Sequence, residues 1–176
     1  NALDEKAVQK IFDVKGRPAY NPLIVHVASL SQVHSLVSWW PPAADRLAEA
    51  FWPGPLTLVL PKNDSIPDIV TAGLRNVALR LPSHPVARAL LREVSLPVAA
   101  PSANRSSHLS PTTALHVEKS LGNTVELILD GGSTPLGIES TVVLLTSSGG
   151  RVLRPGALTV DEIESTLGRK VEHRET

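Results

Sequence analysis

Paired cations mark the first stretch of this sequence that could do chemistry. Lys15 and Arg17 flank a glycine, and Arg154 stands in the turn Arg-Pro-Gly. Two cations beside a residue that lets the backbone approach a ligand suit a polyphosphate or a carboxylate. Surface cations are also common, and a solvated basic loop after a helix would carry the same pair. Taken alone, these residues therefore indicate an anion site without establishing one.

A polar loop supplies the complementary hydroxyl and amide groups. Ser102 and Asn104 follow the apolar run 98–100, and Ser110 precedes Pro111. An oxygen-bearing cap followed by proline predicts that a helix starts here. The loop would then present hydroxyls, amides and free backbone N–H groups to an anion at a helix N-terminus. Ordinary turn chemistry accounts equally for Ser and Asn in a loop.

His26 and Ser140 are weaker candidates. A lone histidine in an apolar strand is more often a core residue than a ligand, and Ser140 could equally cap the start of a strand. Ser140 lacks the flanking glycines of a nucleophile elbow, so acyl-enzyme chemistry is poorly supported. The six histidines show no zinc-helix spacing, and no metal site is predicted. The sequence contains neither a Walker loop nor Gly-x-Gly-x-x-Gly.

Composition indicates a globular protein of one domain. The chain has 176 residues, 42% hydrophobic and 19% charged, with 17 basic and 17 acidic side chains. The balanced charge gives no overall basic field for nucleic acid or a membrane surface. Without cysteine there is no thiol nucleophile or disulfide, which fits a reducing, cytoplasmic location. No apolar run reaches the roughly 20 residues that cross a bilayer.

Alternating strand and helix patterns must position these residues, and they predict an α/β or α+β fold with a mixed sheet. One predicted helix, 85–94, places Val86, Leu90, Leu91 and Val94 on one side. We predict strands at 23–27, 56–60, 77–81, 98–100, 125–129, 141–145 and 151–153, the last two as a hairpin. We predict helices at 4–12, 32–39, 43–52, 85–94, 111–121 and 159–168.

The order of several motifs resembles the YrdC/TsaC family of threonylcarbamoyl-AMP synthases. The resemblance covers residues 1 to about 160. It implies a single YrdC-like domain at 1–168 with a C-terminal tail at 169–176, and a twisted open mixed sheet with a concave basic substrate face. The motifs are Lys-Gly-Arg-Pro from 15, Phe-Trp-Pro-Gly-Pro from 51, Val-Ala-Leu-Arg-Leu-Pro-Ser-His-Pro from 77, Ala-Pro-Ser-Ala-Asn from 100, Ser-Pro-Thr-Thr from 110, Ile-Leu-Asp-Gly-Gly from 128, Glu-Ser-Thr-Val-Val from 139 and Leu-Arg-Pro-Gly from 153.

The resemblance implies a nucleotidyltransferase that joins L-threonine, bicarbonate and ATP into threonylcarbamoyl-adenylate and releases pyrophosphate. Magnesium would accompany ATP as cofactor, held through phosphates and water. A separate tRNA threonylcarbamoyl transferase complex would use the product in tRNA processing. Direct RNA contact is weakly supported, because such binding depends on neutralising phosphates.

The family's site residues carry over onto matching positions of this sequence. Lys15, Arg17, Ser102 and Asn104 would form the catalytic group. The ATP-binding group would be Lys15, Arg17, Asn104, Ser110 and Arg154. The threonine-binding group would be His26, Arg80, Ser102 and Ser140, with Arg80 suited to a carboxylate.

One family motif, Pro-Thr-Glu-Thr-x-Tyr-Gly, is not in the sequence. In the family it helps to hold threonine and lies just before the segment with which this chain begins. We expect it to be omitted from the chain rather than lost by the protein, because the downstream site positions are intact. The alternative is a non-catalytic YrdC-like module that binds a nucleotide or RNA.

Overall fold

The computed structural model describes residues 1–173 and contains one open, six-stranded mixed sheet. Its strand order is β4-β1-β3-β2-β5-β6. The β1–β3 and β2–β5 pairs are parallel, and the β1–β4, β2–β3 and β5–β6 pairs are antiparallel. The predicted mixed sheet and the predicted hairpin are therefore confirmed. The strands are β1 (Ile24–His26), β2 (Leu56–Pro61), β3 (Asn76–Arg80), β4 (Val98–Ala99), β5 (Thr141–Leu145) and β6 (Gly150–Arg154).

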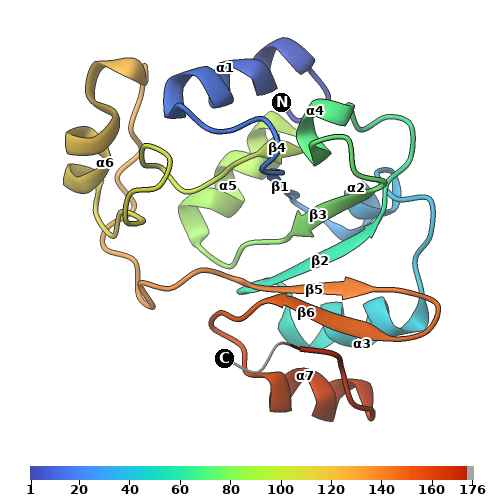
Figure 1. Ribbon diagram of the computed structural model, residues 1–176. Helices are drawn as coiled ribbons and strands as arrows, with labels where there is room; N and C mark the ends of the chain where they lie inside the picture. Colours follow the sequence, from blue (N-terminus) through green and yellow to red (C-terminus); the bar gives the residue numbers. More distant parts are fainter. Residues whose placement is uncertain (174–176) are drawn as a thin grey trace.

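The helices flank this sheet in separate groups. Helices α3 and α7 pack together beside β5 and β6, α1 and α4 lie toward the other end, and α6 stands apart with the loop that precedes it (Figure 1). The helices are α1 (Glu5–Lys15), α2 (Leu30–His34), α3 (Pro42–Phe51), α4 (Asp68–Thr71), α5 (Pro85–Val94), α6 (Ala114–Leu121) and α7 (Val160–Leu167), with a 3-10 turn at Gly122–Thr124.

Alternation along the strands separates a core face from an open face. In β3, Val77 and Leu79 are fully buried, whereas Ala78 and Arg80 face the other side and are partly exposed. Side chains of a strand alternate between the two faces of a sheet, so one face can be packed while the other stays accessible. The open face is the one on which the functional candidates lie.

Helix ends follow the expected capping chemistry. Asp4 caps α1 by accepting the N–H of Lys6 at 2.9 Å. Thr159 and Glu162 form the predicted capping box of α7, and Gly168 ends that helix in the left-handed conformation. Beyond it, Glu172 forms backbone hydrogen bonds with β6 at Gly150 and Val152. The domain boundary at 168 stays a prediction, and residues 174–176 of the predicted tail lie outside the described residues.

Two element predictions after Pro101 are wrong. Residues 125–129 form no strand in the described chain: Leu127 and Leu129 are exposed, and residues 128–140 instead run along the open face as irregular backbone. Helix α6 begins at Ala114, not at Pro111, because the Thr113 side chain accepts the His116 N–H at 3.3 Å and so caps the helix. The loop is therefore longer than predicted, and Ser110 caps no helix.

The apolar side of α5 is only partly buried. Leu91 is buried, but Val86, Leu90 and Val94 are 38%, 43% and 38% exposed. Val86, Leu90 and Leu91 line the open face of the sheet. The four apolar residues thus share one side of α5, as predicted, and three of them form part of one wall of a groove.

Candidate functional site

A groove of about 1390 Å³ occupies the open face of the sheet between α5, α6 and residues 128–140. It brings together side chains from β1, β3, β6 and three loops. Arg17, His26, Arg80, Ser102, Ser110, Ser140 and Arg154, all predicted as site residues, line it. Predicted site residues that lie more than a hundred positions apart in the sequence therefore line the same groove.

Lys15 and Asn104 are also brought to this region, but both are buried beneath its surface. The Lys15 ammonium donates hydrogen bonds to the backbone carbonyls of Ser102 and Asn104. Burial and the Arg17 charge lower the pKa of Lys15, and the Glu139 carboxylate opposes this change. Lys15 therefore holds the polar loop against the end of α1.

Asn104 fixes the same loop from within. Its side-chain amide donates to the carbonyls of Arg105, at 3.0 Å, and His108, at 2.7 Å. Its Oδ1 is buried and has no hydrogen-bond partner in the described part of the chain. An acceptor left unpaired in this way is costly unless a ligand, water or moving donor meets it. Asn104 is not among the residues that line the groove, and its role toward ATP stays a prediction.

His26 and Arg80 end the parallel strands β1 and β3 and are register partners. The Arg80 Nε donates to the Gly54 carbonyl at 3.0 Å, which fixes its guanidinium in the groove. Burial, with the neighbouring Arg80 charge, lowers the pKa of His26 to about 4. His26 is therefore neutral at pH 7, and its Nδ1 has no hydrogen-bond partner among residues 1–173.

The low pKa of His26 predicts an acid-sensitive contribution to stability. Below about pH 6.5 an unfolded histidine binds a proton, whereas folded His26 stays neutral until about pH 4. Stability is therefore lost as the pH falls through this window, and the folding constant changes about tenfold or more. Urea unfolding at pH 7 and pH 4.5 measures this loss, and His26→Gln should show a smaller one. Equal losses in both proteins would contradict the assignment.

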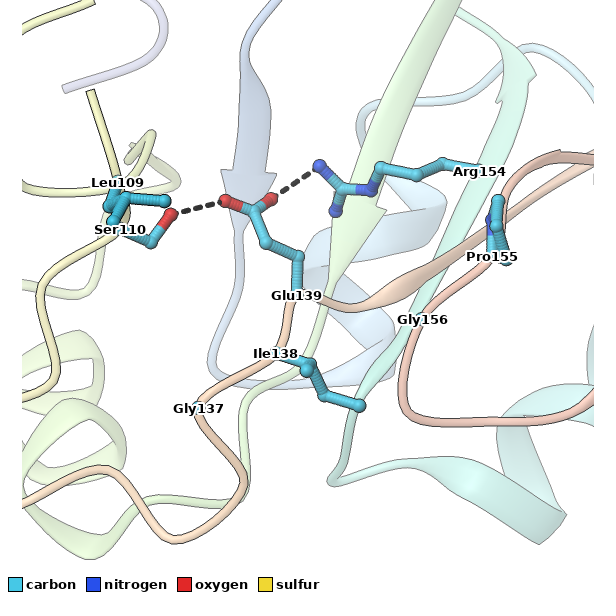
Figure 2. A pocket seen from close by; sticks show the side chains of 8 residues that line it. All are labelled: Leu109, Ser110, Gly137, Ile138, Glu139, Arg154, Pro155 and Gly156. Atoms are coloured by element: carbon cyan, nitrogen blue, oxygen red, sulfur yellow. Dashed lines mark hydrogen bonds and ion pairs between the residues drawn. The ribbon is translucent and has the colours of Figure 1, made fainter. Parts of the chain in front are cut away.

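Glu139 joins the two sides of the groove mouth. Its carboxylate accepts the Ser110 hydroxyl at 2.9 Å and pairs with the Arg154 guanidinium, as Figure 2 shows. Arg154 also donates to the Ser140 carbonyl, at 3.2 Å from Nε and 2.9 Å from the second terminal nitrogen. Ser110 thus contacts β6 through Glu139, although it begins no helix.

Ser140 is almost fully buried, and its hydroxyl is already engaged by the protein. It accepts an Arg154 N–H at 3.0 Å and lies 2.8 Å from the Thr57 hydroxyl. Ser140 therefore ties the start of β5 to β2 and β6 at the floor of the groove. Its role toward threonine stays a prediction.

Arg17, from the loop after α1, also lines the groove. Its guanidinium donates to the carbonyls of Asn21, at 3.1 Å, and Pro22, at 2.9 Å. These bonds leave donors on the guanidinium that can meet an anion, because arginine has five. Arg17, Arg80 and Arg154 give the groove a basic character opposed chiefly by Glu139, whose charge acts on all three of Lys15, Arg17 and Arg80.

Neither a metal cage nor a membrane span is found in the described residues. Within 1–173, no three His, Asp or Glu side chains gather closely enough to hold an ion. No helix in the same range combines the length and apolar character needed to cross a bilayer.

Sequence reasoning missed three contributors to the site. These are Glu139, which accepts from Ser110; Thr57, whose hydroxyl bonds that of Ser140; and the Gly54 carbonyl, which accepts from Arg80. Glu139 carried a detectable signal, because an acidic residue beside a predicted binding serine invites a cationic partner. Backbone carbonyls carry no such signal.

Comparison with known proteins agrees with these observations. The family model Sua5/YciO/YrdC, described as "Telomere recombination", matches residues 1–156. The threonylcarbamoyl-AMP synthase of Pyrococcus abyssi is 51% identical over 168 residues, which cover 96% of this chain and 49% of that protein. The Bacillus subtilis threonylcarbamoyl-AMP synthase is 50% identical over 169 residues, with 96% and 49% covered.

The fold of this chain also matches that of a solved relative. The crystal structure of P. abyssi Sua5 complexed with L-threonine matches with a TM-score of 0.94 and 50% identity, over 98% of this chain and 51% of that one. This chain spans about half the length of these curated relatives. The match over residues 1–156, the same fold and the order of the motifs lead to one conclusion: the chain belongs to the Sua5/YciO/YrdC family.

Proposed function

We propose that this chain provides the substrate site of a threonylcarbamoyl-AMP synthase, a nucleotidyltransferase that makes L-threonylcarbamoyl-adenylate from L-threonine, bicarbonate and ATP. The observation that carries the proposal is the groove, which gathers Arg17, His26, Arg80, Ser102 and Arg154 on one face of the sheet. About half of the residues are shared with two proteins that bear this name.

The proposed reaction asks for positioning and charge neutralisation. The threonine amine attacks the bicarbonate carbon and forms the N–C bond of a carbamate, with loss of water. A carbamate oxygen then attacks the α-phosphorus of ATP, and the bond to the β-phosphate oxygen breaks to release pyrophosphate. No protein nucleophile is needed, so fixed cations and hydrogen-bond donors supply the catalysis.

We propose different roles for the cations of the groove. Arg80, beside neutral His26, suits the threonine carboxylate, because a guanidinium binds a carboxylate in a bidentate manner. Arg17 and Arg154 suit the phosphates. Ser102, on the loop that Lys15 fixes, would meet the adenylate as it forms.

We propose that magnesium enters with ATP. The described residues hold no ligand set for a protein cage. Magnesium commonly keeps several waters and binds through substrate phosphates, and the ion would neutralise phosphate charge there. The protein's part would be to orient the phosphates with Arg17 and Arg154.

The proposed product would pass to a tRNA threonylcarbamoyl transferase complex, and both reactions would take place in the cytoplasm.

A non-catalytic module that binds nucleotide or RNA is the less favoured function. The neutral net charge argues against sequence-independent RNA binding, which relies on phosphate neutralisation.

Arg17→Ala is expected to lower kcat/KM for ATP at least tenfold, equivalent to about 1.4 kcal/mol of transition-state stabilisation. The variant removes a groove cation and the bonds that brace residues 21–22. Pyrophosphate release at varied ATP measures the effect. Arg46→Ala, on the exposed side of α3, is the matched control and should behave as wild type. Unchanged kinetics in Arg17→Ala would remove Arg17 from the site.

Product identity tests the reaction itself. The full-length protein, given ATP, threonine and ¹³C-bicarbonate, should make an adenylate whose mass contains both threonine and one ¹³C. An adenylate without the ¹³C label, or AMP and ADP alone, would contradict the proposed chemistry.

A further inference from the structure

Glu139 connects the loop before α6 to the end of β6. Among the described residues, no other side chain bonds to both segments. Ser110 belongs to the loop before α6, and Arg154 ends β6; each bonds a different oxygen of the Glu139 carboxylate. Figure 2 shows the carboxylate pointing across the mouth, with Ser110 on one side and Arg154 on the other. Glu139 therefore acts as a bridge between the loop and the sheet.

The segment that carries Glu139 is itself held rigidly. The Glu139 carbonyl accepts the Ala157 N–H at 3.1 Å, and the next residue, Ser140, is locked by Thr57 and Arg154. Gly156 packs so closely on this backbone that a Cβ there would lie 2.5 Å from Thr141 N. Arg154 already donates three hydrogen bonds to Ser140, and the Glu139 carboxylate adds a contact to the remaining terminal nitrogen of the guanidinium.

The negative charge of Glu139 could also affect catalysis directly, by making the groove less positive. It is the acidic group that acts on Lys15, Arg17 and Arg80, so its removal makes the groove more positive. A more positive groove should attract ATP more strongly and lower its KM. If Glu139 instead positions Arg154, its removal should lower kcat, because a displaced Arg154 meets the phosphates poorly in the transition state.

We propose that Glu139 is a positioning residue that fixes the Arg154 guanidinium at the groove mouth and ties the loop at Ser110 to the end of β6. It does not contact substrate in this proposal; it acts through Arg154. The kinetic part rests on the proposed synthase function, whereas the structural part concerns the bridge itself.

The kinetic test compares Glu139→Ala with Glu139→Gln in the full-length protein. Glu139→Ala should lower kcat about fivefold or more and leave KM for ATP unchanged or lower. Glu139→Gln should restore most of kcat, because its amide can accept from Arg154 and donate to Ser110 without a charge. In an Arg154→Ala background, Glu139→Ala should cost less than about twofold. Glu172→Ala breaks the comparable pair with Arg151 outside the groove and should leave kcat unchanged.

The structural test uses the ¹⁵Nη1–H signal of the Arg154 guanidinium, because Nη1 is the nitrogen that pairs with Glu139, and the signal is assigned by its loss in Arg154→Lys. The signal should shift and broaden in Glu139→Ala, stay near its wild-type position in Glu139→Gln, and change less in Ser110→Ala. An unchanged signal in folded Glu139→Ala would overturn the bridge. A lower KM with unchanged kcat, or an equal kcat loss without Arg154, would overturn the positioning role. If wild type releases no threonine-dependent pyrophosphate, the synthase proposal fails, and the Arg154 signal still decides whether Glu139 fixes the guanidinium.

Discussion

Lys15→Ala is expected to lower ATP-dependent pyrophosphate release at least tenfold. The Lys15 ammonium holds the carbonyls of Ser102 and Asn104, and the Lys15 carbonyl accepts the Ser106 N–H at 2.9 Å. Without the ammonium, buried carbonyls lose their donor, at about 1–3 kcal/mol for each unsatisfied group. The loop that presents Ser102 then moves away from the groove.

A second lysine on the same helix provides the control for this variant. Lys10 pairs with Glu126 at 2.6 Å, and both side chains are exposed. Lys10→Ala should therefore leave turnover and the free energy of unfolding close to wild type. Kinetics for Lys15→Ala that match those of Lys10→Ala would show that Lys15 neither fixes the loop nor serves ATP.

Gly156→Ala is expected to disturb the groove mouth and to lower kcat/KM about a hundredfold. A Cβ at this position would strike the Glu139 carbonyl and lie 2.5 Å from both Ser140 C and Thr141 N. All three are backbone atoms and cannot rotate aside. The turn after Arg154 must shift, and displacements of about 1 Å near a reacting centre can cost this much.

The same substitution should lower the free energy of unfolding by about 1–3 kcal/mol, the usual cost of inserting a methyl group into a packed position. Gly149→Ala is the control, since no atom lies within 4 Å of its added Cβ. Thermal unfolding and steady-state kinetics of both variants measure the contrast. A fully active Gly156→Ala protein would show that the 139–141 segment need not hold its position.

Regular elements with clear periodicity were predictable from the sequence. Helix 85–94 has the predicted bounds, and the apolar segments 141–145 and 151–153, joined through the turn residues 147–150, correctly predicted the β5–β6 hairpin. The capping box at Thr159 located α7. In these segments, local preference and the buried face agree, so the pattern alone was sufficient.

Predictions failed where tertiary contacts overrode the local pattern. The largely apolar segment 125–129 predicted a strand, yet it pairs with no strand in the described structure, and its residues 128 and 129 line the groove. Ser110 and Pro111 form a sound helix start, but Ser110 bonds Glu139 instead and Thr113 caps α6. Such choices depend on partners distant in the sequence.

The sequence predicted which residues belong to the site better than it predicted how those residues contact one another. The resemblance supplied Lys15, Asn104 and Arg154, and the structure places all three at or beneath one groove. It did not reveal that Lys15 fixes a loop or that Glu139 joins two segments. Both facts depend on backbone positions that only the folded chain defines.

The most direct test of the proposed synthase activity is an omission assay of pyrophosphate release by the full-length protein. With ATP, threonine and bicarbonate together, we expect sustained release. Omission of threonine, or of bicarbonate, should reduce release to background. Equal release without threonine would contradict the synthase assignment.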